Sequence, residues 1–147
     1  MNPSCVVLSP EHHAPPLKVL GTQVTVLASN GGMHGPGITL QRGAEGCGPP
    51  PHRHDWNESF YVLGGQIEFF CDGRKHLCLP GTLVCVPRGT VHGFRYGAGG
   101  GRMLEITGAD ALASQMFTAV HNETPAGPLD IPALLAVLQR NGVTLAA

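Results

Sequence analysis

Short runs of β-branched and aromatic residues alternate with turn residues from about position 21 to position 107. Runs of roughly four to eight such residues, bounded by Gly, Pro, Asn or Asp, predict β-strands. Gly64 and Gly65 predict a hairpin turn between two of these strands. The pattern predicts an all-β domain at residues 21–108, with the strand spacing of a sandwich or a barrel. The expected strands are 21–27, 38–42, 59–62, 66–70, 75–79, 82–86, 91–96 and 103–107.

The two ends of the chain follow different patterns. Residues 1–20 are rich in proline and are expected to form an irregular arm. Residues 109–147 are expected to form a helical tail. At 110–120, apolar residues recur at helical spacing, which predicts a helix with Asp110 as its N-cap.

A second helix is predicted at residues 131–140. Asp130 is suited to cap its N-terminus, and Pro132 lies in the first turn, where the missing N–H does no harm. Asn141 and Gly142 are suited to end it. Its apolar residues form one stripe, so we expect this helix to pack on the barrel.

Composition limits the classes of function. A chain of 147 residues fits one domain. The net charge is −1 and only 13% of residues are charged, without a run of one sign, so neither a nucleic-acid surface nor an anionic-membrane surface is predicted. A small molecule is the expected partner.

The five cysteines are an odd number and contain no Cys-x-x-Cys pair, which indicates free thiols in a reducing compartment rather than a disulfide framework. Cys78 and Cys85 lie in apolar strands and are expected to be buried. Residues 1–10 lack the pattern of a signal peptide, and no later segment is long and apolar enough to span a bilayer. We therefore expect a cytoplasmic protein.

Four residues in two stretches have the chemistry of metal ligands. In an extended strand His52 and His54 point to the same face, about 7 Å apart, so both imidazoles can reach one ion. Glu58 begins the next expected strand, and His92 follows a turn built on Pro87 and Gly89. Three nitrogens and one oxygen suit a first-row divalent metal (Mn, Fe, Co, Ni, Cu or Zn) and leave positions for substrate or water.

The first stretch resembles the first of the two sequence motifs of the cupin superfamily, whose fold is a small antiparallel jelly-roll barrel. The motif Gly-x5-His-x-His-x3-4-Glu-x6-Gly is matched by Gly46, His52, His54, Glu58 and Gly65. Every fixed position is filled.

The second stretch resembles the second motif, Gly-x5-Pro-x-Gly-x2-His-x3-Asn, through Gly81, Pro87, Gly89 and His92, with Tyr96 in place of Asn. The Asn is not a metal ligand in the family, so this departure bears on a local hydrogen bond and on the substrate pocket. The resemblance covers about residues 36–107 and implies a jelly-roll barrel with one or two short C-terminal helices and a metal on His52, His54, Glu58 and His92.

The C-terminal segment is similar to the terminal helix of small quercetinase-like cupins, and this resemblance implies a dioxygenase that cleaves an aromatic or enediol substrate. Glu58 would bind the metal and also accept a substrate proton, provided that its surroundings raise its pKa. Strand parity places Phe60, Phe94 and Tyr96 beside the metal, either as substrate-lining residues or as ordinary barrel filling.

Other functions of the same residues stay open. Metal-bearing cupins also include redox-neutral isomerases, cyclases and lyases, and a third alternative is a binding or sensing module without turnover. A single terminal helix is not a helix-turn-helix, which disfavours a transcription factor. Because many cupins dimerise through their terminal strands, we expect a homodimer in which residues 1–20 take part.

The remaining histidines and some flanking residues are given no part in the site. Trp56 is expected at the barrel mouth, and Arg53 and Arg88 are expected to face solvent. His76 is expected to face solvent from a strand. The histidines expected in solvated loops are His12, His13, His34 and His121.

Overall fold

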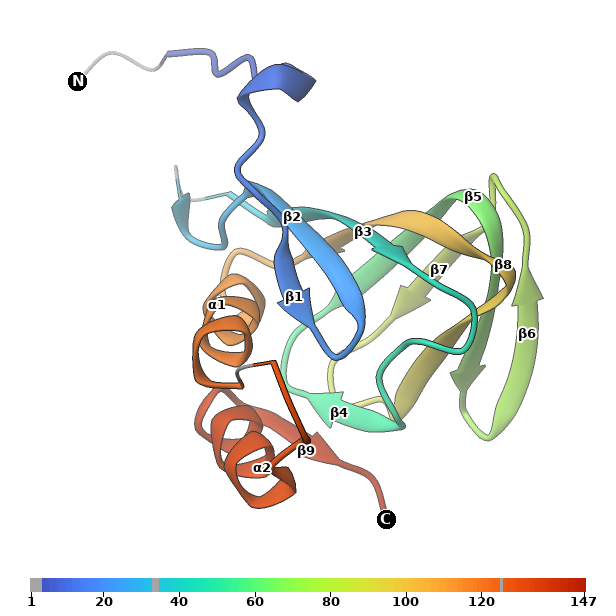
Figure 1. Ribbon diagram of the computed structural model, residues 1–147. Coiled ribbons are helices and arrows are strands. Elements are labelled where there is room, and N and C mark those ends of the chain that lie inside the picture. The colour runs from blue at the N-terminus through green and yellow to red at the C-terminus, as the bar shows by residue number, and fades with distance from the viewer. Residues whose placement is uncertain (1–3, 33–34, 125) are drawn as a thin grey trace.

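The computed structural model describes residues 4–32, 35–124 and 126–147. Nine strands in these ranges form a curled antiparallel sheet, a jelly-roll barrel, and two α-helices pack at one end of it (Figure 1). The helices are α1 (Ala113–Glu123) and α2 (Ile131–Arg140), and a short 3-10 helix spans Pro10–His12. The strands are β1 (Leu17–Val19), β2 (Thr22–Ala28), β3 (Gly37–Gly43), β4 (His52–His54), β5 (Glu58–Cys71), β6 (Arg74–Cys78), β7 (Leu83–Val86), β8 (His92–Thr107) and β9 (Val143–Leu145).

The longest strands, β5 and β8, pair from Glu58 opposite Thr107 to Cys71 opposite His92 and form the centre of the barrel. One path through the sheet runs β1-β2-β3-β8-β4-β9, and β6 and β7 both pair with β5. The all-β fold with two C-terminal helices is confirmed. The expected strands at 21–27, 38–42, 75–79 and 82–86 correspond to β2, β3, β6 and β7.

The predicted hairpin at Gly64 and Gly65 is wrong. Both glycines lie inside β5, where the register with β8 shifts between Val62 and Gly64 and again after Gly65. Gly65 has a φ of 70°, and a Cβ there would lie 2.1 Å from the Gly100 carbonyl oxygen. Glycine is therefore required because the β8 backbone passes so close, not because the chain reverses.

The same correction applies to the expected strands at 91–96 and 103–107, which are the two halves of β8. The glycine-rich segment between them continues the ladder, with Gly101 opposite Gly65. Glycines on the two strands face each other at the bulge. Because glycine has no side chain, the two backbones can approach closely without a steric clash.

The ends of the chain are partly as predicted. Residues 17–19 of the expected arm form β1, which pairs with β2. Asp130 caps α2, since its Oδ1 accepts a hydrogen bond from the Ala133 N–H at 3.0 Å. Asp110 does not cap α1, because that helix begins three residues later; instead it pairs with Arg88 at 3.2 Å. The tail also contains β9, which sequence patterning did not predict.

Two apolar cores flank the barrel opening. One fills the barrel with aromatic residues, including Phe60, Phe69 and Phe94. The other joins α1 and α2 to β1, β2 and Trp56. All five cysteines lie in the described residues and are free, but Cys85 is exposed, contrary to expectation, while Cys78 is buried. None of the described helices has the length and apolar character needed to cross a membrane.

Candidate metal centre

The curl of the barrel brings together four side chains from three strands. Glu58 and His92 are the first residues of β5 and β8, so they lie at opposite ends of the β5–β8 ladder. The short strand β4 closes this gap, because its His52 lies directly opposite His92. His52 and His54 follow one another on the same face of β4, with ring centroids 5.7 Å apart.

One ligating atom from each of His52, His54 and His92 lies within 4.8 Å of the others, a cluster that could hold a metal ion. Glu58 joins this cluster through Oε2, which lies 3.0 Å from Nε2 of His54 and 2.9 Å from Nε2 of His92. The four residues singled out in the sequence are therefore brought to one place.

Backbone carbonyl groups determine which nitrogen of each imidazole is free to bind a metal ion. Nδ1 of His52 lies 2.9 Å from the Pro50 carbonyl oxygen, Nδ1 of His54 lies 3.2 Å from that of Trp56, and Nδ1 of His92 lies 2.9 Å from that of Thr90. Each Nδ1 therefore carries the proton, and each Nε2 lone pair is free to bind a cation. A metal site in which every histidine binds through Nε2 requires this tautomer.

His54 and His92 also place Nε2 against an oxygen of Glu58. A neutral imidazole has one N–H, so it cannot donate to an oxygen at both nitrogens. Protonation of the ring resolves this conflict, and so does a divalent cation between Nε2 and the carboxylate. The donor set, three imidazole nitrogens and a carboxylate oxygen, fits a first-row divalent metal.

Burial and neighbouring charges shift the pKa values of His52, His92 and Glu58 in different directions. Burial, together with the nearby His92, lowers the pKa of His52 to about 4, so His52 is neutral near pH 7. Burial acts to lower the pKa of His92 as well, but the hydrogen bond and charge of Glu58 outweigh it, and the pKa is raised. Burial would raise the pKa of Glu58, yet hydrogen bonds from Glu105, His54 and His92 hold it well below its usual range. The raised pKa expected of Glu58 as a base is thus not found.

A second carboxyl group, Glu105 on β8, lies beside Glu58. It is 2% exposed, and its Oε2 accepts hydrogen bonds from Thr39 Oγ1 at 2.7 Å and Gln41 Nε2 at 2.6 Å. Burial, and then the hydrogen bond and charge of Glu58, raise the pKa of Glu105 well above its usual range. The pair therefore consists of a carboxylate, Glu58, and a neutral carboxylic acid, Glu105.

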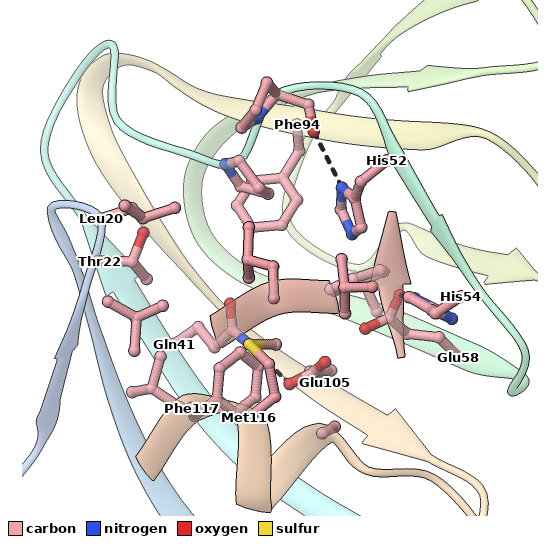
Figure 2. Close-up of a pocket in the computed structure, with 18 of the residues that line it drawn as sticks. Leu20, Thr22, Gln41, His52, His54, Glu58, Phe94, Glu105, Met116 and Phe117 are labelled. Carbon is pink, nitrogen blue, oxygen red and sulfur yellow. Dashed lines mark hydrogen bonds and ion pairs between the residues drawn. The ribbon is translucent and has the colours of Figure 1, made fainter. Parts of the chain in front are cut away.

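Three of the four residues, His52, His54 and Glu58, form part of the wall of a pocket of about 80 Å³ between the two apolar cores (Figure 2). Phe60 and Phe94 line it, and their role as substrate-lining residues stays a prediction. Tyr96, expected beside them, packs against Phe94 with ring centroids 5.6 Å apart and is not part of the pocket wall. The other side of the pocket comes from the C-terminal tail, whose lining residues are Ala113, Met116, Phe117, Leu138, Val143 and Leu145.

Sequence reasoning missed Gln41, Glu105 and the side of the pocket that the C-terminal tail forms. Gln41 and Glu105 are polar residues at buried, inward-facing positions of β3 and β8, so strand parity could have identified them. Strand β9 pairs with β4, with Val143 opposite His54, and three residues offer too short a pattern to predict such a long-range pairing.

The flanking residues differ from expectation in two cases. Trp56 is buried, at 3% exposure, rather than at the barrel rim. His121 lies in α1, and its Nδ1 accepts a hydrogen bond from the Lys18 N–H at 2.9 Å, so it is not a loop residue. Arg53, Arg88, His12 and His76 are exposed as predicted, His13 is partly buried, and His34 lies outside the described residues.

Comparisons with known proteins agree with this geometry. The family model described as "Cupin domain" matches residues 39–106, which include the four candidate ligands. Quercetin 2,3-dioxygenase from Bacillus subtilis is 33% identical over 92 residues, which cover 60% of this chain. The match spans only 27% of that protein.

Solved structures share the fold at low sequence identity. KdgF from Halomonas sp. aligns with a TM-score of 0.65 at 19% identity, covering 72% of this chain and 94% of that one. The polyketide cyclase RemF from Streptomyces resistomycificus aligns with a TM-score of 0.64 at 23% identity, covering 73% and 81%. A predicted oxalate decarboxylase from Thermotoga maritima aligns with a TM-score of 0.63 at 18% identity, covering 70% of this chain and 98% of that one. The jelly-roll barrel, the paired motifs and the match over residues 39–106 together identify a cupin domain in this chain.

Proposed function

We propose that this protein is a metal-dependent enzyme acting on a small molecule, a quercetinase-like dioxygenase whose substrate is an aromatic or enediol compound. The observation that carries the proposal is the convergence of His52, His54, His92 and Glu58. The first two histidines and Glu58 also line an apolar pocket together with Phe60 and Phe94. The partial match to a quercetin dioxygenase supports the choice of reaction.

His52, His54, Glu58 and His92 would hold one divalent ion, which supplies Lewis acidity and a template for substrate oxygens. The Nδ1 bonds to backbone carbonyls keep each ring oriented for this task. Glu58 would act as the anionic ligand, and because its pKa is held well below the usual range it would accept a proton from a substrate hydroxyl only as a weak base. Phe60 and Phe94 exclude water and provide flat apolar surface for a ring.

A redox-neutral isomerase, cyclase or lyase is the second candidate, and Glu105 favours it. A neutral carboxylic acid beside a carboxylate provides both a proton donor and a proton acceptor. An isomerase or lyase that removes a proton at one atom and delivers one at another can use this pair of groups, whereas a dioxygenase can work without the acid.

The first experiment is elemental analysis of untagged protein purified without chelator, in parallel with a His54→Ala variant. His76→Ala, at an exposed position of β6, is the matched control. We expect about one equivalent of a transition metal in the wild type and in the control, and none in His54→Ala. Stoichiometric metal in none of the three proteins would contradict the proposal.

Oxygen uptake then separates the two candidates. Consumption of dioxygen with catechol or enediol compounds supports the dioxygenase. Product formation without oxygen uptake supports the redox-neutral reaction, and binding without product indicates a non-catalytic module.

A further inference from the structure

Gln41 and Glu105 are buried polar side chains in a pocket whose lining is otherwise largely apolar. They are 3% and 2% exposed, respectively. Apart from the candidate ligands, Thr22 and Trp56 are the other described residues of the pocket lining that carry a polar side-chain atom. Burying a polar group costs free energy unless each of its atoms has a partner, so these atoms can be examined one by one.

The position of the Gln41 side chain is fixed by a closed set of hydrogen bonds. Its Nε2 donates to Glu105 Oε2 at 2.6 Å and to Thr39 Oγ1 at 3.2 Å. The Thr39 hydroxyl donates in turn to the same Glu105 oxygen at 2.7 Å. Both N–H groups of the amide are therefore used on the barrel side, and the orientation of the amide is determined.

The amide oxygen of Gln41 is left over. Among the described residues it accepts no hydrogen bond, and Figure 2 shows the Gln41 side chain reaching into the pocket. A water molecule can donate to this oxygen while the pocket is empty. A ligand that displaces the water must bring its own donor, or it leaves a buried acceptor unpaired.

The amide oxygen of Gln41, which has no partner among the described residues, adds a substrate contact to the proposed function, and the inference rests on that function. We propose that Gln41 determines substrate specificity: its Oε1 accepts a hydrogen bond from a hydroxyl carried by an aromatic diol, at a position away from the two ring oxygens that face the metal centre. Glu105 and Thr39 act as positioning residues for the amide. The substrate class is a flat ring with vicinal oxygens at one end and one further hydroxyl at the other.

Two catechols of nearly equal size test this assignment. Ethylcatechol and its hydroxyethyl analogue, each substituted para to one ring hydroxyl, differ by a single distal hydroxyl. Calorimetric titration of metal-loaded wild type under nitrogen is expected to give about fivefold tighter binding of the hydroxyethyl compound. In Gln41→Met, which keeps the length of the side chain, the preference is expected to fall below about twofold. Metal content should not change.

Phe117→Leu is the matched control, because it alters an apolar part of the same pocket wall. It should change both affinities by the same factor and preserve the ratio. Equal affinities in wild type overturn the inference even if Gln41→Met does not fold, and so does a preference that persists in Gln41→Met. Binding of neither catechol by metal-loaded protein overturns the substrate class. Failure of the proposed function is distinguishable, since it is detected as missing metal before any catechol is added.

Discussion

The indole of Trp56 lies flat against the imidazole of His54, with ring centroids 4.1 Å apart and planes within 5° of parallel. The carbonyl of Trp56 also accepts the hydrogen bond from His54 Nδ1 at 3.2 Å. One residue therefore sets both the plane and the tautomer of a candidate ligand. Because Trp56 belongs to the same core as residues of α1 and α2, the C-terminal helices help to hold the candidate metal ligand His54 in place.

Replacing Trp56 by Leu should weaken metal binding about tenfold, the lower end of what loss of an orienting partner costs. Trp56→Phe keeps an aromatic face and should lose less than about threefold. Competition with a chromogenic chelator measures both affinities. Thermal melting of the metal-free variants separates this effect from the general cost of a cavity. Equal losses in the two variants would argue against orientation by stacking.

Glu58→Gln should lower the pKa of His92 in the metal-free protein. The carboxylate is what raises that pKa against the opposing effect of burial, so burial should prevail once the charge is removed. Titration of the imidazole C–H resonances by NMR measures the change. Glu68→Gln, at a partly exposed residue paired with Lys75 at 3.5 Å, is the control and should leave His92 unchanged. A pKa of His92 that is the same in both variants would contradict the ion pair.

Metal affinity should depend on pH through His92. Its pKa is raised in the metal-free protein, so a bound proton must leave before Nε2 can bind a cation. Affinity should therefore rise as pH increases through this raised pKa and level off above it. His52, with a pKa of about 4, is already neutral and releases no proton near pH 7. Calorimetry in two buffers of different ionisation enthalpy measures the proton release, and an affinity that does not change across this range would contradict the prediction.

Local spacing was sufficient to predict that His52 and His54 lie together, whereas the assignment of His92 to the same cluster depended on the resemblance to the cupin motifs. His52 and His54 are separated by one residue on a strand, so their common face follows from the period of the strand alone. Asp130 was predicted for a similar reason, because a cap and the helix it serves are neighbours in sequence. Features that depend on neighbouring residues could be read from the chain directly.

Features that depend on distant segments could not be predicted from local sequence. Gly65 has the local signature of a turn, and only the close approach of Gly100, far along the chain, explains its place inside a strand. Glu105 and Gln41 are paired across two strands, and β9 completes the pocket by pairing with β4. Such pairings require the register of the whole barrel, which the pattern of a single segment does not contain.

A homodimer stays a prediction, and the N-terminal arm offers a way to test it. In Figure 1 the described part of the arm ahead of β1 extends away from the barrel, and Val6 and Val7 are 64% and 86% exposed. Sedimentation at micromolar concentration should give twice the 15.4 kDa chain mass. Replacing both valines by Lys should give the monomer, whereas Leu77→Lys, at a 63% exposed position of β6, should not. Only the monomer mass in the wild type would contradict the prediction.

Asp130 and Asp110 provide a matched pair for testing helix capping, since both were predicted as N-caps and only Asp130 accepts a hydrogen bond from its helix. Asp130→Ala removes the acceptor for the Ala133 N–H and should lower the free energy of unfolding by about 1 kcal/mol. Asp110→Ala breaks an exposed ion pair with Arg88 and should cost less than about 0.5 kcal/mol. Urea denaturation of the metal-free variants measures both changes. Equal losses would mean that the stability of α2 comes from its apolar stripe and not from its cap.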